Sequence, residues 1–144
     1  NTDKYKGNPT EIIYRSGWEL QMMMEFDKNP NVIEWSSECK IINYSNPITK
    51  RLHRYFPDFY VKQKTIKGDI ETLIIEVKPM HEVLKPVLTR DKKSYAKKAA
   101  TYIKNQAKWK AAKRYCEIHK YKFRVITKDK AERFVMLTEQ ELGL

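Results

Sequence analysis

The sequence predicts a mixed α/β domain in which helices pack against a central sheet. Three observations predict this fold class. The expected elements follow the order helix, three strands, helix, strand; the expected strands are rich in β-branched and aromatic residues; and apolar residues in the helices recur at helical spacing. The 144 residues show no internal repeat, and a chain of this length can bury a sizeable core. We therefore expect a single domain over residues 1–144.

The first helix is expected to begin at Ser16, because Ser16 to Glu19 matches the S-x-x-E capping box. It should end before the Asn29-Pro30 pair. Three apolar residues follow Glu19 at helical spacing, which places Glu19 on the apolar face of the helix. These residues are Met22, Met23 and Phe26.

The strands are bounded by turn residues. The expected strands are 32–36, 53–63, 72–78, 123–127 and 134–137, and segment 41–44 is expected to continue the first of them after a bend. Residues 67–69 should form a hairpin connection. Pro79 should end the strand expected at 72–78, because proline has no backbone N–H to donate to a ladder. A last turn is expected at 138–141.

A long helix is expected at about 93–119, with one apolar face that packs on the sheet and a stripe of lysines on its flank. The apolar face comprises Tyr102, Trp109, Ala112 and Cys116, and the basic stripe comprises Lys97, Lys104 and Lys108.

Two carboxylates lie where the apolar pattern predicts buried strand positions. Asp58 follows Pro57 at the start of an aromatic and β-branched run, and Glu76 directly follows three aliphatic residues. A strand around Glu76 should be covered on both faces, where an ionised carboxylate is costly unless a partner or a metal compensates it. Lys78 lies two positions after Glu76, so strand alternation points both side chains to one face. We expect Asp58, Glu76 and Lys78 to converge on a site for a divalent cation.

The charge distribution favours a polyanionic partner. The net charge is +11 and the isoelectric point is about 9.6. Residues 90–130 contain fifteen Lys or Arg and only three acidic residues, so this segment holds the whole positive excess and the rest of the chain sums to about −1. We expect the lysine stripe to contact the phosphate backbone of a nucleic acid, with Arg15 as a further phosphate-binding residue. The alternatives are a solvated helix face for the stripe and a structural ion pair for Arg15.

The two cysteines, Cys39 and Cys116, lack the spacing of a metal site. They favour a reduced intracellular setting, with a single disulfide as the alternative. No apolar run approaches the length that spans a bilayer, and no signal peptide is recognisable, so we expect no membrane partner.

A family resemblance lies in these same residues. Pro57-Asp58 followed by Glu76-Val77-Lys78 resembles the motif of the PD-(D/E)XK nuclease superfamily, and Glu19 resembles the additional helix-borne acid of some of its branches. Segments 14–19 and 55–59 resemble more specifically the TnsA-type endonucleases, and in particular the head completion nucleases of T4-type phages. The resemblance extends over about residues 5–142, including 105–109 and 137–139.

The resemblance implies a restriction-endonuclease-like αβββαβ core and Mg²⁺-dependent cleavage of DNA phosphodiester bonds, with Mn²⁺ as a substitute. It also implies a role in finishing filled phage heads, in the host cytoplasm or the virion, with portal or head proteins as partners. The oligomeric state stays open.

The expected chemistry follows from the charge of the substrate. Hydrolysis of an anionic phosphodiester needs charge neutralisation and a deprotonated water, and a hard cation with oxygen ligands supplies both. We expect Asp58 and Glu76 to ligate this cation, with the carbonyl of Val77 as a third ligand and Glu19 as a further one. Lys78 would orient the attacking water and stabilise charge on phosphorus.

Each assignment has a structural alternative. Pro57-Asp58 also fits a strand-edge turn, Glu76 and Lys78 also fit a surface ion pair, and Glu19 also fits a capping role. The functional alternatives are a non-catalytic DNA-binding head protein at the portal, and a nuclease of junctions or transposon ends.

Overall fold

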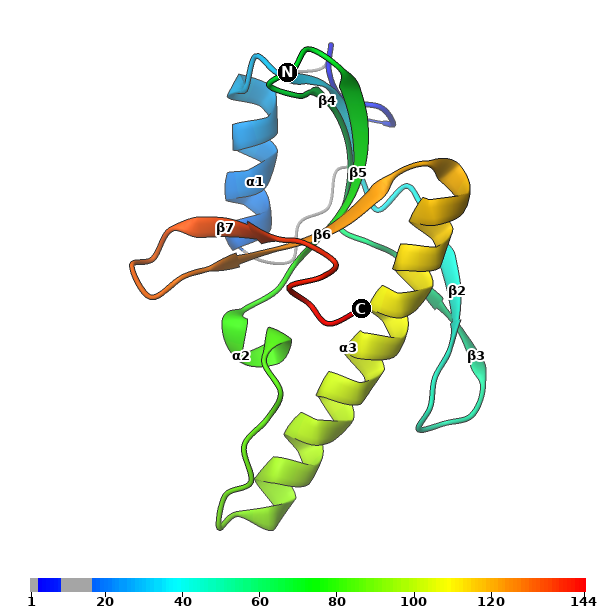
Figure 1. Ribbon diagram of the computed structural model, residues 1–144, viewed down its shortest axis with the longest axis vertical. Helices are drawn as coiled ribbons and strands as arrows, with labels where there is room; N and C mark the ends of the chain where they lie inside the picture. Colours follow the sequence, from blue (N-terminus) through cyan, green and yellow to red (C-terminus); the bar gives the residue numbers. More distant parts are fainter. Residues whose placement is uncertain (1–2, 9–16) are drawn as a thin grey trace.

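The structure is a computed structural model, and it describes residues 3–8 and 17–144. Its helices and strands are arranged around one central sheet (Figure 1). In chain order they are α1 (Gly17–Lys28), β1 (Val32–Ser37), β2 (Ile42–Ser45), β3 (Leu52–Tyr55), β4 (Phe59–Lys64), β5 (Ile70–Val77), α2 (Met80–Val83), α3 (Lys92–His119), β6 (Lys122–Lys128) and β7 (Phe134–Leu137).

The central sheet has five strands in the order β1-β4-β5-β6-β7. β1, β4 and β5 pair antiparallel, β5 and β6 pair parallel, and β7 returns antiparallel to β6. The parallel pair needs a crossover, which α3 provides. The elements α1, β1, β4, β5, α3 and β6 therefore confirm the expected mixed α/β fold and its αβββαβ core.

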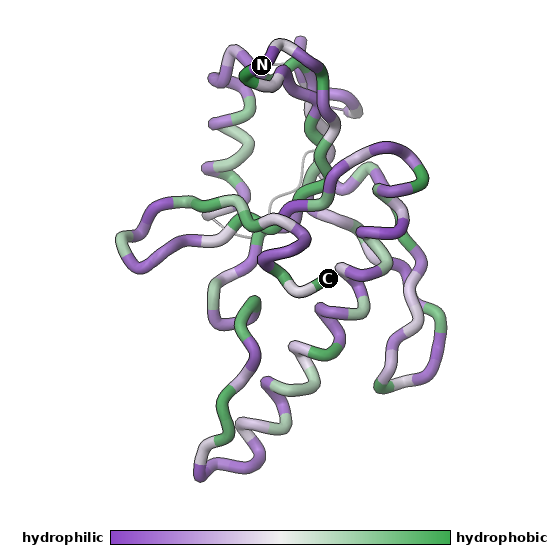
Figure 2. Tube along the Cα trace, viewed as in Figure 1, coloured by the Kyte–Doolittle hydropathy of each residue, from purple (hydrophilic) through white to green (hydrophobic). Residues whose placement is uncertain are grey.

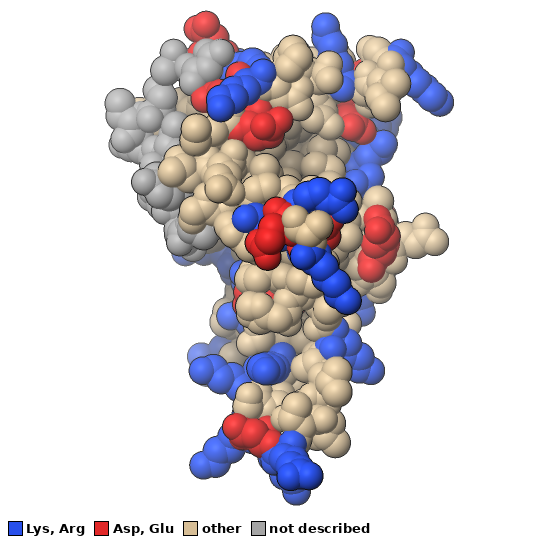
Figure 3. Space-filling model, turned by 90° about the vertical axis from the view of Figure 1, so that its left-hand side faces the viewer, with Lys and Arg blue, Asp and Glu red and all other residues tan. Residues whose placement is uncertain are grey.

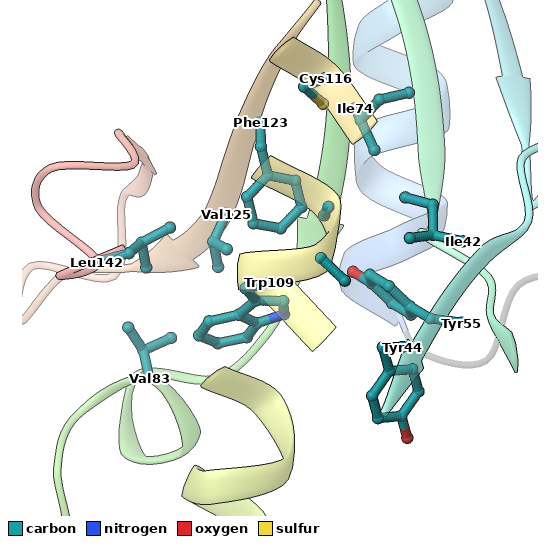
Figure 4. Packing of buried hydrophobic residues seen from close by; sticks show 12 residues of the cluster. Ile42, Tyr44, Tyr55, Ile74, Val83, Trp109, Cys116, Phe123, Val125 and Leu142 are labelled. Atoms are coloured by element: carbon teal, nitrogen blue, oxygen red, sulfur yellow. The ribbon is translucent and has the colours of Figure 1, made fainter. Parts of the chain in front are cut away.

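The two faces of the sheet carry separate apolar clusters. α1 contributes Met22, Met23 and Phe26 to one face, as the sequence predicts. α3 contributes Trp109, Ala112 and Cys116 to the other, where they pack against side chains from the sheet and from β2 and β3 (Figure 4). Apolar and hydrophilic residues are interspersed along α1 and α3 (Figure 2), because each of these helices presents one side to a cluster.

Strand β5 is covered on both faces over its second half, as predicted. Ile74 and Glu76 point toward α3, while Leu73, Ile75 and Val77 point toward α1. The turn before β5 also forms where expected, with Gly68 in the left-handed region at φ 87°.

Two predictions about the middle of the chain are wrong. Segment 41–44 does not continue β1, because β2 pairs with β3 in a separate two-stranded sheet. Segment 53–63 is not one strand either: β3 ends at Tyr55 and β4 begins at Phe59. Pro57 lies in this break, where no ladder hydrogen bond from its nitrogen is required.

The long helix forms almost as predicted, but two details differ. The side chain of Asp91 accepts a hydrogen bond from the Ser94 amide and caps the start of α3. Tyr102 does not lie on the sheet; it lines a small pocket beside α2, together with His81. The short helix α2 itself was not predicted. Among the described helices, none has the combined length and apolar character needed to cross a bilayer.

Candidate active site

All four residues predicted to be catalytic line one cleft of about 360 Å³, which opens where β4 begins and β5 ends. Its complete lining is Glu19, Arg54, Tyr55, Phe56, Asp58, Glu76, Val77, Lys78 and Lys108. The N-terminal turn of α1, the end of β3, the final residues of β5 and the middle of α3 therefore meet at this point.

Asp58 and Glu76 lie on the same side of the sheet, and their carboxyl groups are close enough to share a hydrogen bond when one of them is protonated. Asp58 immediately precedes β4, and its Oδ2 accepts a hydrogen bond of 2.7 Å from the backbone amide of Val77. This bond fixes Asp58 beside the end of β5. The convergence expected from the sequence is thus present in the structure.

Glu76 is buried, with 5% of its surface exposed, and its carboxylate has a specific partner. The hydroxyl of the buried Tyr55 donates a hydrogen bond to Glu76 Oε2. Tyr55 lies at the end of β3, so the small hairpin outside the main sheet holds one of the two central acids in place. No sequence pattern indicates this contact, because Tyr55 falls within the strand predicted at 53–63.

The surroundings of Asp58 disfavour simultaneous ionisation of Asp58 and Glu76 when no cation is bound. Burial, the hydrogen bond to Glu76 and the negative charge of Glu76 raise the pKa of Asp58 to about 9, although the Val77 amide and Lys78 act in the opposite direction. Asp58 keeps some contact with solvent, but its carboxyl group is largely enclosed by protein. Two acids in contact need either a shared proton or a cation between them.

The donor set fits a hard divalent cation, which prefers carboxylate, carbonyl and water oxygens. Asp58 and Glu76 are the two carboxylates in contact, and Val77 lines the same cleft. In the part of the chain that the structure describes, no three Asp, Glu, His or Cys side chains gather closely enough to hold a metal ion. Glu19 therefore shares the cleft with the acid pair without forming a three-acid cluster with it.

Two lysines supply positive charge to the cleft. Lys78 is half-buried and follows β5 directly, with its amide bonded to the carbonyl of Ile126 at 3.0 Å. Lys108 reaches the cleft from α3, and its Nζ lies 5.4 Å from the ring centre of Tyr55. Burial and the charge of Lys104 lower the pKa of Lys108. The sequence places Lys108 on a basic stripe, but only the fold brings it to the acids.

The other predicted phosphate-binding residues lie at different places. Lys104 is exposed on α3, close enough to Lys108 to affect its pKa. Lys97 is exposed nearer the start of α3, beside the small pocket at α2. This end of the molecule, shown at the bottom of Figure 3, carries many Lys and Arg side chains and few acidic ones. Arg15, and the capping residue Ser16, lie outside the described residues.

Comparisons with known proteins identify relatives of the chain. Residues 29–128 match the family described as TnsA-like endonuclease N terminal. The chain is 37% identical over 134 residues to the head completion nuclease of Enterobacteria phage T4, and the alignment covers 90% of this chain and 87% of the phage protein. No solved structure gives a significant match. The family match includes Asp58, Glu76, Lys78 and Lys108, while Glu19 precedes it.

Proposed function

The chain belongs to the TnsA-like endonuclease family, and on that premise we propose that it hydrolyses phosphodiester bonds of DNA with a bound divalent cation, Mg²⁺ or Mn²⁺. The single observation that supports this most directly is the enclosed pair formed by Asp58 and Glu76, which shares a cleft with two lysines. A pair of contacting acids is poorly suited to a purely structural role, because it destabilises the fold at neutral pH.

Asp58 and Glu76 would hold the cation, with the Val77 carbonyl as a third protein ligand. Glu19, which forms no three-acid cluster with them, would contact the cation through a water molecule. When bound, the cation would neutralise phosphate charge and lower the pKa of a water molecule. Tyr55 keeps the Glu76 carboxylate in position through its hydroxyl.

The cationic side chains have separate roles in this proposal. Lys78 lies two residues after Glu76 in the same cleft, where its ammonium would hold the attacking water and stabilise the charge that develops on the phosphate. Lys108 enters from the opposite wall on α3 and would bind the phosphate of the cleaved strand. The stripe through Lys104 would continue the contact along the DNA backbone.

The biological setting is proposed from the relative. The phage T4 protein is named a head completion nuclease, and its alignment extends over most of both chains. We place this chain in the same step of phage assembly, acting on the ends of packaged DNA beside portal or head proteins.

The test is a cleavage assay on linear and circular DNA with Mg²⁺, with Mn²⁺, and with a chelator. We expect cutting with either cation, and a loss of at least roughly a hundredfold in Asp58→Ala and Lys78→Ala, given the usual effects of removing such groups. Asp69→Ala and Lys67→Ala are matched controls, because both residues are exposed in the turn between β4 and β5. Circular dichroism would verify that the variants are folded. Cutting by Asp58→Ala at the parent rate would refute the site.

A further inference from the structure

The β2–β3 hairpin forms no part of the central sheet, but its base lies directly beside the active-site cleft. β1 and β4 pair directly, with Ser37 opposite Phe59, so residues 38–58 are an excursion between two neighbouring strands. Glu38 begins the excursion with a left-handed backbone (φ 48°). Its amide bonds to the carbonyl of Asp58 at 3.0 Å and closes the base of the excursion next to the acid pair.

The two faces of this hairpin differ sharply. Ile42, Tyr44 and Tyr55 are buried against α3 and anchor the inner face (Figure 4). The outer face consists of two exposed cross-strand pairs, whose side chains make no contribution to the core. These pairs are Asn43 with Arg54, nearer the cleft, and Ser45 with Leu52, nearer the tip.

Every Lys, Arg, Asp or Glu in the hairpin segment, residues 40–57, is a basic one. Residues 40–57 contain four Lys or Arg and no Asp or Glu, although 18 acidic residues occur in the chain. Lys50 and Arg51 are exposed in the turn at the tip. Arg54 lines the active-site cleft, with its guanidinium 5.8 Å from the ring centre of Phe56. Basic side chains therefore lie at both the cleft end and the tip of the hairpin.

We propose that the outer face of the β2–β3 hairpin binds in a groove of duplex DNA next to the cleft, and so positions the strand that is cut. This inference rests on the proposed action on DNA. A two-stranded ribbon fits the major groove, and Arg and Asn are the side chains that form paired hydrogen bonds with guanine and adenine. Leu52, with 73% of its surface exposed, supplies an apolar contact of the kind made to thymine methyl groups. Lys50 and Arg51 at the tip bind the flanking phosphates.

The experiment measures the affinity of the full chain for a short labelled duplex in a chelator, over a range of KCl concentrations. The double variant Lys50→Gln/Arg51→Gln is expected to bind roughly tenfold more weakly at low salt, with a salt slope smaller by about two, because each lost phosphate contact removes about 0.9. The matched control is Lys64→Gln/Lys67→Gln, which removes the same charge at the other end of the molecule (Figure 1). It should change neither quantity by as much.

Asn43→Ala tests the groove itself because it changes no charge. We expect weaker binding at an unchanged salt slope, with an unchanged thermal unfolding temperature. The proposal is overturned if the double variant binds like its control, or if Asn43→Ala binds like the parent chain. A parent chain that binds DNA through the hairpin but never cuts it would refute the proposed function and leave this inference standing. A chain that cuts DNA while its hairpin variants bind normally would refute this inference and leave the proposed function standing.

Discussion

The hydroxyl of Tyr55 donates a hydrogen bond to the carboxylate of Glu76, and this contact joins the separate β2–β3 hairpin to the acid pair. Tyr55 also forms part of the apolar cluster under α3. One side chain therefore connects the hydrophobic core, the hairpin and the centre of the cleft.

Tyr55→Phe keeps the ring and removes only this hydroxyl. We expect cation affinity or cleavage rate to fall by roughly tenfold or more, as is usual when a group that orients a metal ligand is lost. Single-turnover cleavage measured against Mg²⁺ concentration would separate weaker cation binding from slower cleavage. Tyr60→Phe is the matched control, since its hydroxyl donates instead to Glu34 at 3.0 Å. Equal Mg²⁺ dependence and equal cleavage rates in the two variants would contradict this role.

The acid pair predicts how stability depends on pH. The pKa of Asp58 is raised to about 9, so the folded state binds a proton that the unfolded chain releases above its ordinary value of 3.8. The stability that this proton contributes is fully present below pH 3.8 and is lost as pH rises toward 9. In a chelator, the free energy of unfolding should therefore fall over this window, by at most about 1.4 kcal/mol per pH unit from this group.

Asp58→Asn should flatten this part of the profile and stabilise the metal-free protein at pH 8, while abolishing cleavage. Urea unfolding at a series of pH values would measure the effect. Asp69→Asn, at an exposed position, should keep the parent profile. An unchanged slope in Asp58→Asn would show that the acid pair does not bind the extra proton.

Lys108 and Lys97 lie on the same helix but should differ in effect. Lys108→Met removes a cation from the cleft wall, whereas Lys97→Met removes one from an exposed site near α2. Both should weaken DNA binding slightly and reduce the salt slope by about one contact. Only Lys108→Met should also slow the single-turnover rate, by roughly tenfold or more, because only Lys108 can reach the reacting phosphate. Equal rates in the two variants would remove Lys108 from the site.

Thr127 offers a test of the core that is independent of function. Its hydroxyl is fully buried in β6, and it has no hydrogen-bond partner among the described residues. Thr127→Val replaces the hydroxyl with a methyl group of similar size on the same β-branched frame. We expect the free energy of unfolding to rise by about 1 kcal/mol, because an unpaired buried polar group is removed. A loss of stability in urea unfolding would mean that the hydroxyl has a partner.

The sequence predicted most of the sheet and both large helices, because local patterns determine them. Strand periodicity around Glu76 identified a fully covered strand and put Lys78 on its side of the sheet. The prediction of one strand from 53 to 63 was wrong because composition alone does not show whether a proline falls within a strand or between two. Lys97, Lys104 and Lys108 formed one stripe in sequence, yet of these only Lys108 lines the cleft.

By itself the sequence identified the candidate residues: Asp58 and Glu76 fall where the apolar pattern predicts burial, and Lys78 follows Glu76 at the spacing that puts both on one face. Such patterns are local properties of the chain. The tertiary structure decided which distant groups meet them. Tyr55 and Lys108 lie 21 and 32 residues from Glu76, and they reach it only because β3 and α3 pack on the same face of the sheet. Such contacts depend on long-range packing, which no pattern of neighbouring residues encodes.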